Sequence, residues 1–324
     1  MTGPLYPLRF EPIFKSMLWG GRQLPEFLRR PTSGTDPIGE AWVLSDVDGN
    51  ASRVANGPLA GRTLRDLLST DLKRLLGKTR LTNGRFPLLL KFIDAKQELS
   101  VQVHPNDDQA HARVPGANGK TEAWVILEAN PQTSRIYAGF RDGVGEQHFR
   151  SALQSKTTPT TLHSFTPKPG DCVFLPAGTV HAIGADILLF EVQQTSDITY
   201  RLYDWDRVDT KTGRSRDLHI DDGLTCSDFA TGPRHPVEPK FIKGSLRERL
   251  VNCSYFTLDR LNLDQPIQLG APGEWRIIVV ASGQGTIAGE LIATGDVVLI
   301  PAELGVCEVV PSGVLTIFEC GLPE

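Results

Sequence analysis

Residues 170–177 read "GDCVFLPA", and residues 295–302 read "GDVVLIPA". The two stretches align without a gap, and each is a short apolar run between a Gly-Asp pair and a Pro-Ala pair, which is typical of a buried strand. A second pair of similar runs precedes them, "EAWVILEA" at 122–129 and "EWRIIVVAS" at 274–282. This internal repeat predicts two copies of one β unit, and therefore a duplicated barrel.

The two copies differ in the distance between their matching runs, so the first copy must carry an insertion. The segment 143–156, "GVGEQHFRSALQSK", is a candidate helix that fits this place, and the leucine spacing of 61–77 predicts a second helix. Closely spaced apolar runs elsewhere favour strands. The proline-rich stretch 231–240 is the expected linker. We therefore expect a first domain over 1–235 and a second domain over 236–324.

Composition limits the function classes. The chain has 324 residues, 40% hydrophobic and 22% charged, which is enough to form a packed core. A net charge of −4 favours neither a nucleic-acid partner nor an anionic membrane surface. No run approaches the roughly 18 apolar residues of a membrane span. Five cysteines without a CxxC pair, and no apolar leader, predict reduced thiols in a cytoplasmic protein. The oligomeric state is left open.

The two copies also differ where chemistry is expected. In the first copy the strand is followed by Gly178-Thr179-Val180-His181, whereas Val306 takes the position of His181 in the second copy. A histidine kept in one copy and absent from the other predicts one working site and one structural barrel.

A polar strand face accompanies this histidine. In "ELSVQVHPND", residues 98–107, Val101 and Val103 alternate with Ser100, Gln102 and His104. Because successive side chains of a strand point to opposite faces, the three polar side chains share one face. Two of them, two residues apart, are placed to bind one ion together.

Four residues of the first copy have metal-ligand character: Gln102, His104, Glu122 and His181. Two imidazoles, a carboxylate and an amide suit one divalent first-row ion, zinc first among them. The residues alone leave an alternative open, in which both histidines make structural hydrogen bonds and Glu122 is a solvated charge.

The chain also resembles a known family. The motifs "QVHP", "KTE" and "PAGTVHA" in a duplicated barrel are similar to the cupin superfamily. Further stretches resemble the short bacterial form of type I mannose-6-phosphate isomerase, from "EPIFKSMLWGGRQL" at 11–24 and "IGEAWVLSD" through "FPLLLKFIDAKQELSVQVHPND" to "SDITYRLYDWDR" at 196–207. The resemblance covers nearly the whole chain. It implies a mainly β fold of two cupin (double-stranded β-helix, or jelly-roll) barrels.

The resemblance also implies a function and a set of site residues. The activity would be a metal-dependent aldose–ketose isomerisation of mannose 6-phosphate and fructose 6-phosphate through an enediol or enediolate, with one zinc ion per chain. The metal ligands would be Gln102, His104, Glu122 and His181. The catalytic-site arginine would be Arg201. Positions that match the family's substrate pocket are Ser100, Lys120, Glu191 and Arg207.

The proton carrier stays open at this point. Isomerisation moves a proton between two neighbouring carbons, and this step needs a general base. Glu191 is favoured because the resemblance places it in the pocket, while Lys120, a metal-bound water, Asp204 and Asp206 are alternatives. Arg201 and Arg207 are shaped to bind a phosphate group. For Trp42 we expect core packing, and Lys91 either lines the pocket or extends its ammonium to solvent.

Three other functions are weighed against this one. Two histidines and one carboxylate also describe iron-dependent oxygenases. A cupin barrel can be a non-enzymatic sugar-binding protein, because fold does not dictate function. An isomerase of an unphosphorylated sugar would use the same metal without the phosphate site.

Overall fold

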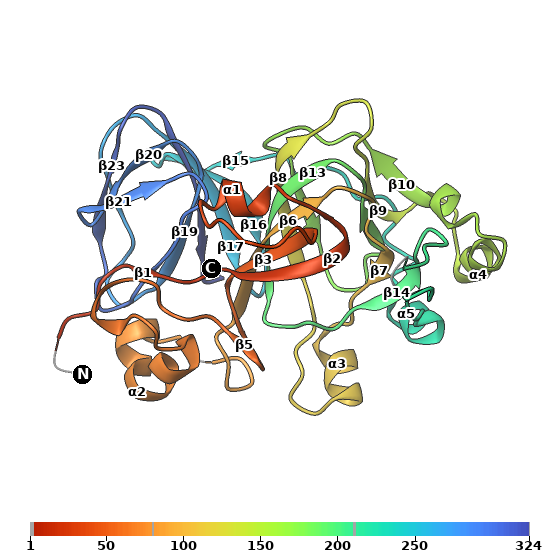
Figure 1. The fold of residues 1–324 in the computed structure, drawn as a ribbon, viewed down its shortest axis with the longest axis horizontal. Helices are drawn as coiled ribbons and strands as arrows, with labels where there is room; N and C mark the ends of the chain where they lie inside the picture. Colours follow the sequence, from red (N-terminus) through yellow and green to blue (C-terminus); the bar gives the residue numbers. More distant parts are fainter. Residues whose placement is uncertain (1–2, 80, 210–211, 324) are drawn as a thin grey trace.

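The computed structural model describes residues 3–79, 81–209 and 212–323. Two β barrels lie side by side, one built from residues 13–203 and the other from the last third of the chain together with residues 8–9 (Figure 1). Every strand pairing within these barrels is antiparallel. The predicted mainly β class is therefore confirmed.

The first barrel has two sheets. The larger sheet has the strand order β11-β8-β13-β6-β2-β3, and the smaller one has the order β10-β9-β12-β7-β14. The strands of the larger sheet are β2 Ile13–Gly21, β3 Ile38–Leu44, β6 Leu88–Ala95, β8 Glu122–Ala129, β11 Cys172–Leu175 and β13 Ile187–Gln194. Those of the smaller sheet are β7 Val101–Val103, β9 Ile136–Phe140, β10 Leu162–Phe165, β12 His181–Ile183 and β14 Tyr200–Tyr203.

The second barrel repeats this plan. Its sheets have the orders β1-β22-β19-β24-β17-β16-β15 and β18-β23-β20-β21. The strands of the larger sheet are β1 Leu8–Arg9, β15 Lys240–Phe241, β16 Arg247–Asn252, β17 Thr257–Leu263, β19 Arg276–Ser282, β22 Val297–Ile300 and β24 Leu315–Gly321. Those of the smaller sheet are β18 Ile267–Leu269, β20 Gln284–Ile287, β21 Glu290–Ala293 and β23 Cys307–Pro311. A short pair outside both barrels is formed by β4 Asp46–Val47 and β5 Asn50–Ala51.

The repeated stretches form equivalent strands. In the first barrel β11 pairs with β8, and Leu175 lies opposite Glu122. In the second barrel β22 pairs with β19, and Ile300 lies opposite Arg276. The predicted duplication is therefore confirmed. The boundary between 235 and 236 stays a prediction, and β1 at the start of the chain joins the sheet of the second barrel.

Both predicted helices are present. α2, Leu64–Leu76, begins at a capping box in which Thr63 and Asp66 exchange hydrogen bonds, and it ends at Gly77 with φ of 63°. α4, Glu146–Gln154, lies between β9 and β10, where the insertion is expected. Three helices had no clear signal in the sequence: α1 Leu24–Phe27, α3 Asp107–Arg113 and α5 Ile220–Cys226. Two 3-10 turns, η1 Gly57–Leu59 and η2 Thr158–Thr161, complete the elements.

The largest apolar core lies between the barrels. Phe190 on β13 has its ring centroid 5.6 Å from that of Phe92 and 5.7 Å from that of Phe318 on β24. All three rings are buried, and one continuous cluster joins residues of both barrels. A separate cluster fills the interior of the second barrel. The larger sheet of the first barrel, which carries Glu122 and Glu191, therefore rests on a rigid apolar layer.

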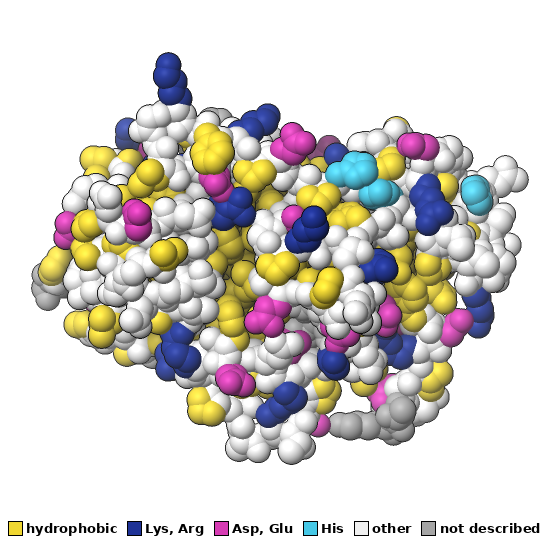
Figure 2. All heavy atoms as spheres, turned by 90° about the horizontal axis from the view of Figure 1, so that it is seen from above, with side chains coloured by type: hydrophobic (Ala, Val, Ile, Leu, Met, Phe, Trp, Pro, Cys, Tyr) yellow, Lys and Arg dark blue, Asp and Glu magenta, His cyan; other side chains and the backbone are white. Residues whose placement is uncertain are grey.

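The surface and the cysteines agree with the composition. Figure 2 shows one face, on which acidic and basic side chains are interspersed with apolar ones. All five cysteines are free thiols, as predicted. Among the described residues, every helix is too short or too polar to cross a bilayer.

Candidate metal centre and cavity

Three strands of the first barrel bring the predicted ligands together. His181 begins β12 and lies opposite Gln102 on β7. Glu122 begins β8, and His104 follows directly after β7. One ligand atom each from His104, Glu122 and His181 lies within 4.8 Å of the others. All three residues are buried.

Both imidazole rings turn Nε2 toward the carboxylate of Glu122. The Nδ1 atoms of His104 and His181 lie 2.8 Å from the backbone oxygens of Ile198 and Thr179. A carbonyl only accepts hydrogen bonds, so each Nδ1 carries the proton and each Nε2 keeps its lone pair. These Nε2 atoms lie 3.6 and 3.3 Å from the carboxylate oxygens of Glu122. Backbone carbonyls that orient ligand histidines in this way are a regular feature of metal sites.

The protonation states suit a metal ion. Burial lowers the pKa of His181 to about 4 and lowers the pKa of His104 well below its ordinary value. Both rings are therefore neutral at pH 7, as metal binding requires. Burial raises the pKa of Glu122 to about 7, and its Oε1 accepts no hydrogen bond. Two neutral nitrogen donors and one carboxylate are a donor set that divalent first-row ions bind, so these residues fit such an ion.

Two further predicted residues border this cluster. The Gln102 Nε2 atom lies 3.3 Å from Nε2 of His181, and the amide oxygen would be the ligand atom if the amide group turned over. The Lys120 ammonium nitrogen lies 2.8 Å from Oε2 of Glu122 and 3.1 Å from Nε2 of His104. A positive charge therefore already sits among the candidate ligand atoms.

A cavity of about 310 Å³ opens beside the cluster. Its wall includes five of the predicted residues, namely Ser100, Gln102, Lys120, Glu191 and Arg201. His104, Glu122 and His181 are buried behind this wall. Arg207 is not among the lining residues, and Arg216 is. The structure thus brings together every predicted site residue except Arg207.

Glu191 is a buried carboxylate at the cavity wall. Its Oε2 accepts a hydrogen bond of 2.9 Å from Nε1 of Trp124, and its Oε1 lies 3.3 Å from the Lys91 ammonium and accepts no hydrogen bond. Burial raises the pKa of Glu191, but the charges of Lys91 and Lys120 outweigh burial and leave this pKa below its ordinary value. The carboxylate is therefore ionised at neutral pH, with Oε1 in an ion pair with Lys91.

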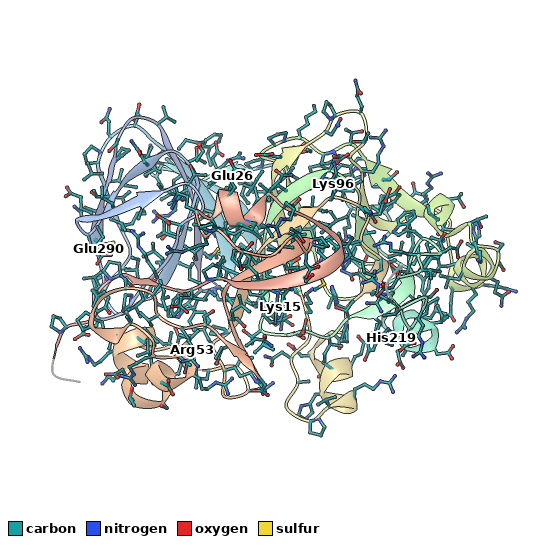
Figure 3. The ribbon with its side chains drawn as sticks, in the orientation of Figure 1. Lys15, Glu26, Arg53, Lys96, His219 and Glu290 are labelled. Atoms are coloured by element: carbon teal, nitrogen blue, oxygen red, sulfur yellow. The ribbon has the colours of Figure 1, made fainter. Side chains whose placement is uncertain are left out.

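Arg201 is placed by the strand that carries it. On β14 it lies opposite Gln102, and its Nη1 donates a hydrogen bond of 2.8 Å to the backbone oxygen of Asp217. Its Nε is buried without a partner, and burial lowers the pKa of the guanidinium. His219, which directly precedes α5 and is labelled in Figure 3, accepts a hydrogen bond from the Arg201 backbone at 3.2 Å.

The two other arginines are positioned differently. Arg207 donates through Nη2 to the backbone oxygen of Glu98, and it is not among the residues that line the cavity. Arg216 forms a two-point ion pair with Asp204, with Nε 2.9 Å from Oδ2. Sequence reasoning missed Arg216 because it lies in an irregular segment without strand or helix periodicity.

Trp42 lies against Lys91, which lines the cavity. Trp42 is buried as predicted, and its Nε1 donates a hydrogen bond of 2.6 Å to Glu40. The ammonium groups of Lys15 and Lys91 lie 4.7 and 5.0 Å from the centre of its ring, and Figure 3 labels Lys15 on β2. Lys91 is 4% exposed and lines the cavity, which decides between its two predicted positions.

The chain has many relatives of known name. A family model described as the catalytic domain of type I phosphomannose isomerase matches residues 8–134. Mannose-6-phosphate isomerase ManA of Bacillus subtilis is 37% identical over 304 residues, which cover 92% of this chain and 94% of that protein. The probable mannose-6-phosphate isomerase GmuF of the same organism is 33% identical, with 93% and 95% covered.

Solved structures agree. The crystal structure of the mannose 6-phosphate isomerase from Bacillus subtilis has a TM-score of 0.88 at 28% identity, and covers 98% of this chain and 99% of its own. A putative mannosephosphate isomerase from Archaeoglobus fulgidus shares the fold, with a TM-score of 0.74 at 21% identity and 99% of both chains covered. From these matches and the geometry of the first barrel, the chain belongs to the type I phosphomannose isomerase family.

Proposed function

We propose that this chain interconverts mannose 6-phosphate and fructose 6-phosphate in the cytoplasm, with one divalent ion per chain, zinc by preference. The observation that carries the proposal is the convergence of two neutral imidazoles on the buried carboxylate of Glu122, beside a polar cavity. The names of the relatives support the substrate and the reaction.

The ion would be held by Gln102, His104, Glu122 and His181. Zinc is preferred because nitrogen donors of histidine and a carboxylate suit it, and because no redox step is needed. When bound, a divalent ion supplies positive charge that stabilises developing negative charge on the substrate oxygens.

Glu191 is the proposed base. The reaction takes a proton from C2 of the aldose and returns one to C1, so the base must be ionised and must reach the cavity. The Oε1 atom of Glu191 accepts no hydrogen bond, and the residue lines the cavity. Lys120, on the same wall, would donate to a substrate oxygen as negative charge develops there.

Arginines would bind the charged parts of the substrate. Arg201 lies across from Gln102, so its guanidinium is placed to face the same substrate oxygens as the ion. We assign phosphate binding to Arg216 together with Ser100, because both line the cavity. Arg207, which the family resemblance also implied, would act by holding the Glu98 backbone.

A coupled assay tests the proposal. Purified protein is given mannose 6-phosphate, and fructose 6-phosphate formation is followed with and without added zinc. Turnover that depends on the metal is expected. Oxygen uptake with bound iron would support an oxygenase, saturable binding without turnover a sugar-binding protein, and equal turnover of mannose an isomerase without phosphate preference. Each of these results would contradict the proposal.

A further inference from the structure

The second barrel has a cavity of its own, of about 470 Å³, which is within the usual size range of small-molecule sites. Its wall carries Arg247, Arg249 and Arg276 together with Asp259, Glu274 and Glu319. Nothing in the proposed isomerase reaction uses these residues. The cavity therefore needs an account of its own.

The strand register shows that this cavity lies at the position in the second barrel that the metal centre has in the first. Glu122 lies opposite Leu175 in the first barrel, and Arg276 lies opposite Ile300 in the second. Leu175 and Ile300 are matching positions of the two repeated stretches. Arg276 is consequently the counterpart of Glu122.

The neighbouring strands extend the correspondence. Glu191 on β13 pairs with Lys91 on β6, and Glu319 on β24 pairs with Asp259 on β17 in the equivalent ladder. Glu319 is thus the counterpart of Glu191, and Asp259 is the counterpart of Lys91. At two of the three positions traced so far, the charge has the opposite sign in the second barrel.

The second cavity is not built for a metal ion. Arg276 replaces the carboxylate ligand, and Cys307, the buried first residue of β23, takes the place of His181 at the start of β12. Val306, the counterpart of His181 in the ungapped alignment, precedes β23 and is 45% exposed. Gly270 lines this cavity, and no histidine does. A guanidinium at the centre of the site repels a cation, so the ligand must be of another class.

Two carboxylates and three guanidinium groups form a network of ion pairs at the wall. Glu319 is 3% exposed, with its Oε2 2.7 Å from Nε of Arg247 and its Oε1 3.2 Å from Nε of Arg276. Arg249 forms an ion pair with Asp259, which is 4% exposed. The Oε1 atom of Glu319 accepts no hydrogen bond, although it is buried. This atom is an acceptor that a ligand hydroxyl would satisfy.

We propose that this cavity binds a neutral monosaccharide through its hydroxyl groups. Guanidinium donors and carboxylate acceptors alternate along the wall, and a sugar hydroxyl both donates and accepts. The charges of the lining residues cancel, so nothing is left to attract an anion, and a phosphate group would meet the fixed charges of Asp259 and Glu319. The inference is independent of the isomerase reaction.

Isothermal titration calorimetry of the full chain tests this, with mannose and fructose as neutral probes and inorganic phosphate as the anionic one. One saturable site for a neutral sugar, with a Kd of about 1 mM or tighter, is expected. Glu319→Gln keeps the side-chain shape, and should weaken binding about tenfold or more because it removes a charged acceptor. Glu308→Gln, an exposed change of equal charge on β23, should leave binding unchanged.

Several results would overturn the proposal: absence of saturable sugar binding, equal binding by the Glu319→Gln variant, or tighter binding of phosphate than of either sugar at the same residues. Thermal melting shows whether the Glu319→Gln variant is folded, and Arg276→Lys replaces it if it is not. Isomerase activity is measured on the same samples. Its absence in all of them would contradict the proposed function and leave the binding result standing.

Discussion

Gln102 on β7 is the cross-strand partner of Arg201 on β14, and on its other side it is the partner of His181 on β12. A candidate metal ligand therefore lies between a second ligand and the guanidinium that would face the substrate. Because two adjacent antiparallel ladders set all three positions, their spacing is fixed by backbone hydrogen bonds rather than by flexible loops. This rigidity leads to predictions that separate metal binding from catalysis.

Removal of an imidazole should remove the ion. His181→Ala takes away one neutral nitrogen donor of the ligand cluster, so we expect metal content to fall from about one ion per chain to near zero. Elemental analysis of the purified variant measures this. His148→Ala, an exposed change on α4, serves as the control and should keep its metal. Equal metal content in both variants would exclude His181 as a ligand.

Loss of the guanidinium should affect turnover alone. Arg201→Ala removes fixed positive charge from the cavity wall but leaves the ligand cluster in place, so kcat should fall by about 10²–10³. Metal content and melting temperature should stay close to those of the unchanged protein. Arg150→Ala on exposed α4 is the matched control. Normal turnover by Arg201→Ala would show that the arginine has no part in the reaction.

Glu191 should matter for proton transfer. Glu191→Gln keeps the hydrogen-bond geometry to Trp124 but cannot accept a proton, so kcat should fall by about 10²–10⁴. Exchange of the C2 proton with solvent, followed by NMR, should slow with it. Glu128→Gln, on the exposed end of β8, controls for the loss of one charge. Undiminished exchange would move the base to Lys120 or to another group.

Phosphate recognition should depend on Arg216 more than on Arg207. Arg216→Ala removes a lining guanidinium and should raise KM for mannose 6-phosphate about tenfold, the cost of one charged hydrogen bond. Arg207→Ala should have a smaller effect on KM, because Arg207 does not line the cavity. Steady-state kinetics of both variants decide this, and the reverse order would return the phosphate site to Arg207.

The contact between the barrels should dominate stability. Phe318→Ala removes a buried ring that packs on Phe190, and should cost about 3–5 kcal/mol in the free energy of unfolding. Phe241→Ala removes a ring that is 78% exposed, and should change the free energy of unfolding by less than about 0.5 kcal/mol. Urea unfolding measures this free energy for both variants. Similar losses in the two variants would mean that the barrels are not stabilised by this layer.

Much of the fold could be predicted because the repeat is local in sequence. The matched strands 172–175 and 297–300 carry the same short pattern, and the leucine stripe of α2 has a clear cap at Thr63. The helix α3 was missed because its seven residues include only two alanines as apolar side chains, so periodicity is absent, although Asn106 and Gln109 form a capping box.

The site was predictable in part for the same reason. Recognisable strand patterns stand next to Gln102, His104, Glu122 and His181. It could therefore be inferred that these four side chains lie close together. Arg216 and the second cavity were not inferred, because both depend on distant segments meeting in space. Arg247 and Glu319, for instance, are 72 positions apart and meet across β17.

The central claim is that four side chains of the first barrel share one ion. Anomalous X-ray scattering from a crystal grown with zinc tests it most directly. The account predicts one strong peak at about 2.0–2.2 Å from Nε2 of His104 and His181 and from an oxygen of Glu122, with the Gln102 amide oxygen facing it. A peak at another place, or none at this cluster in a fully active enzyme, would contradict it.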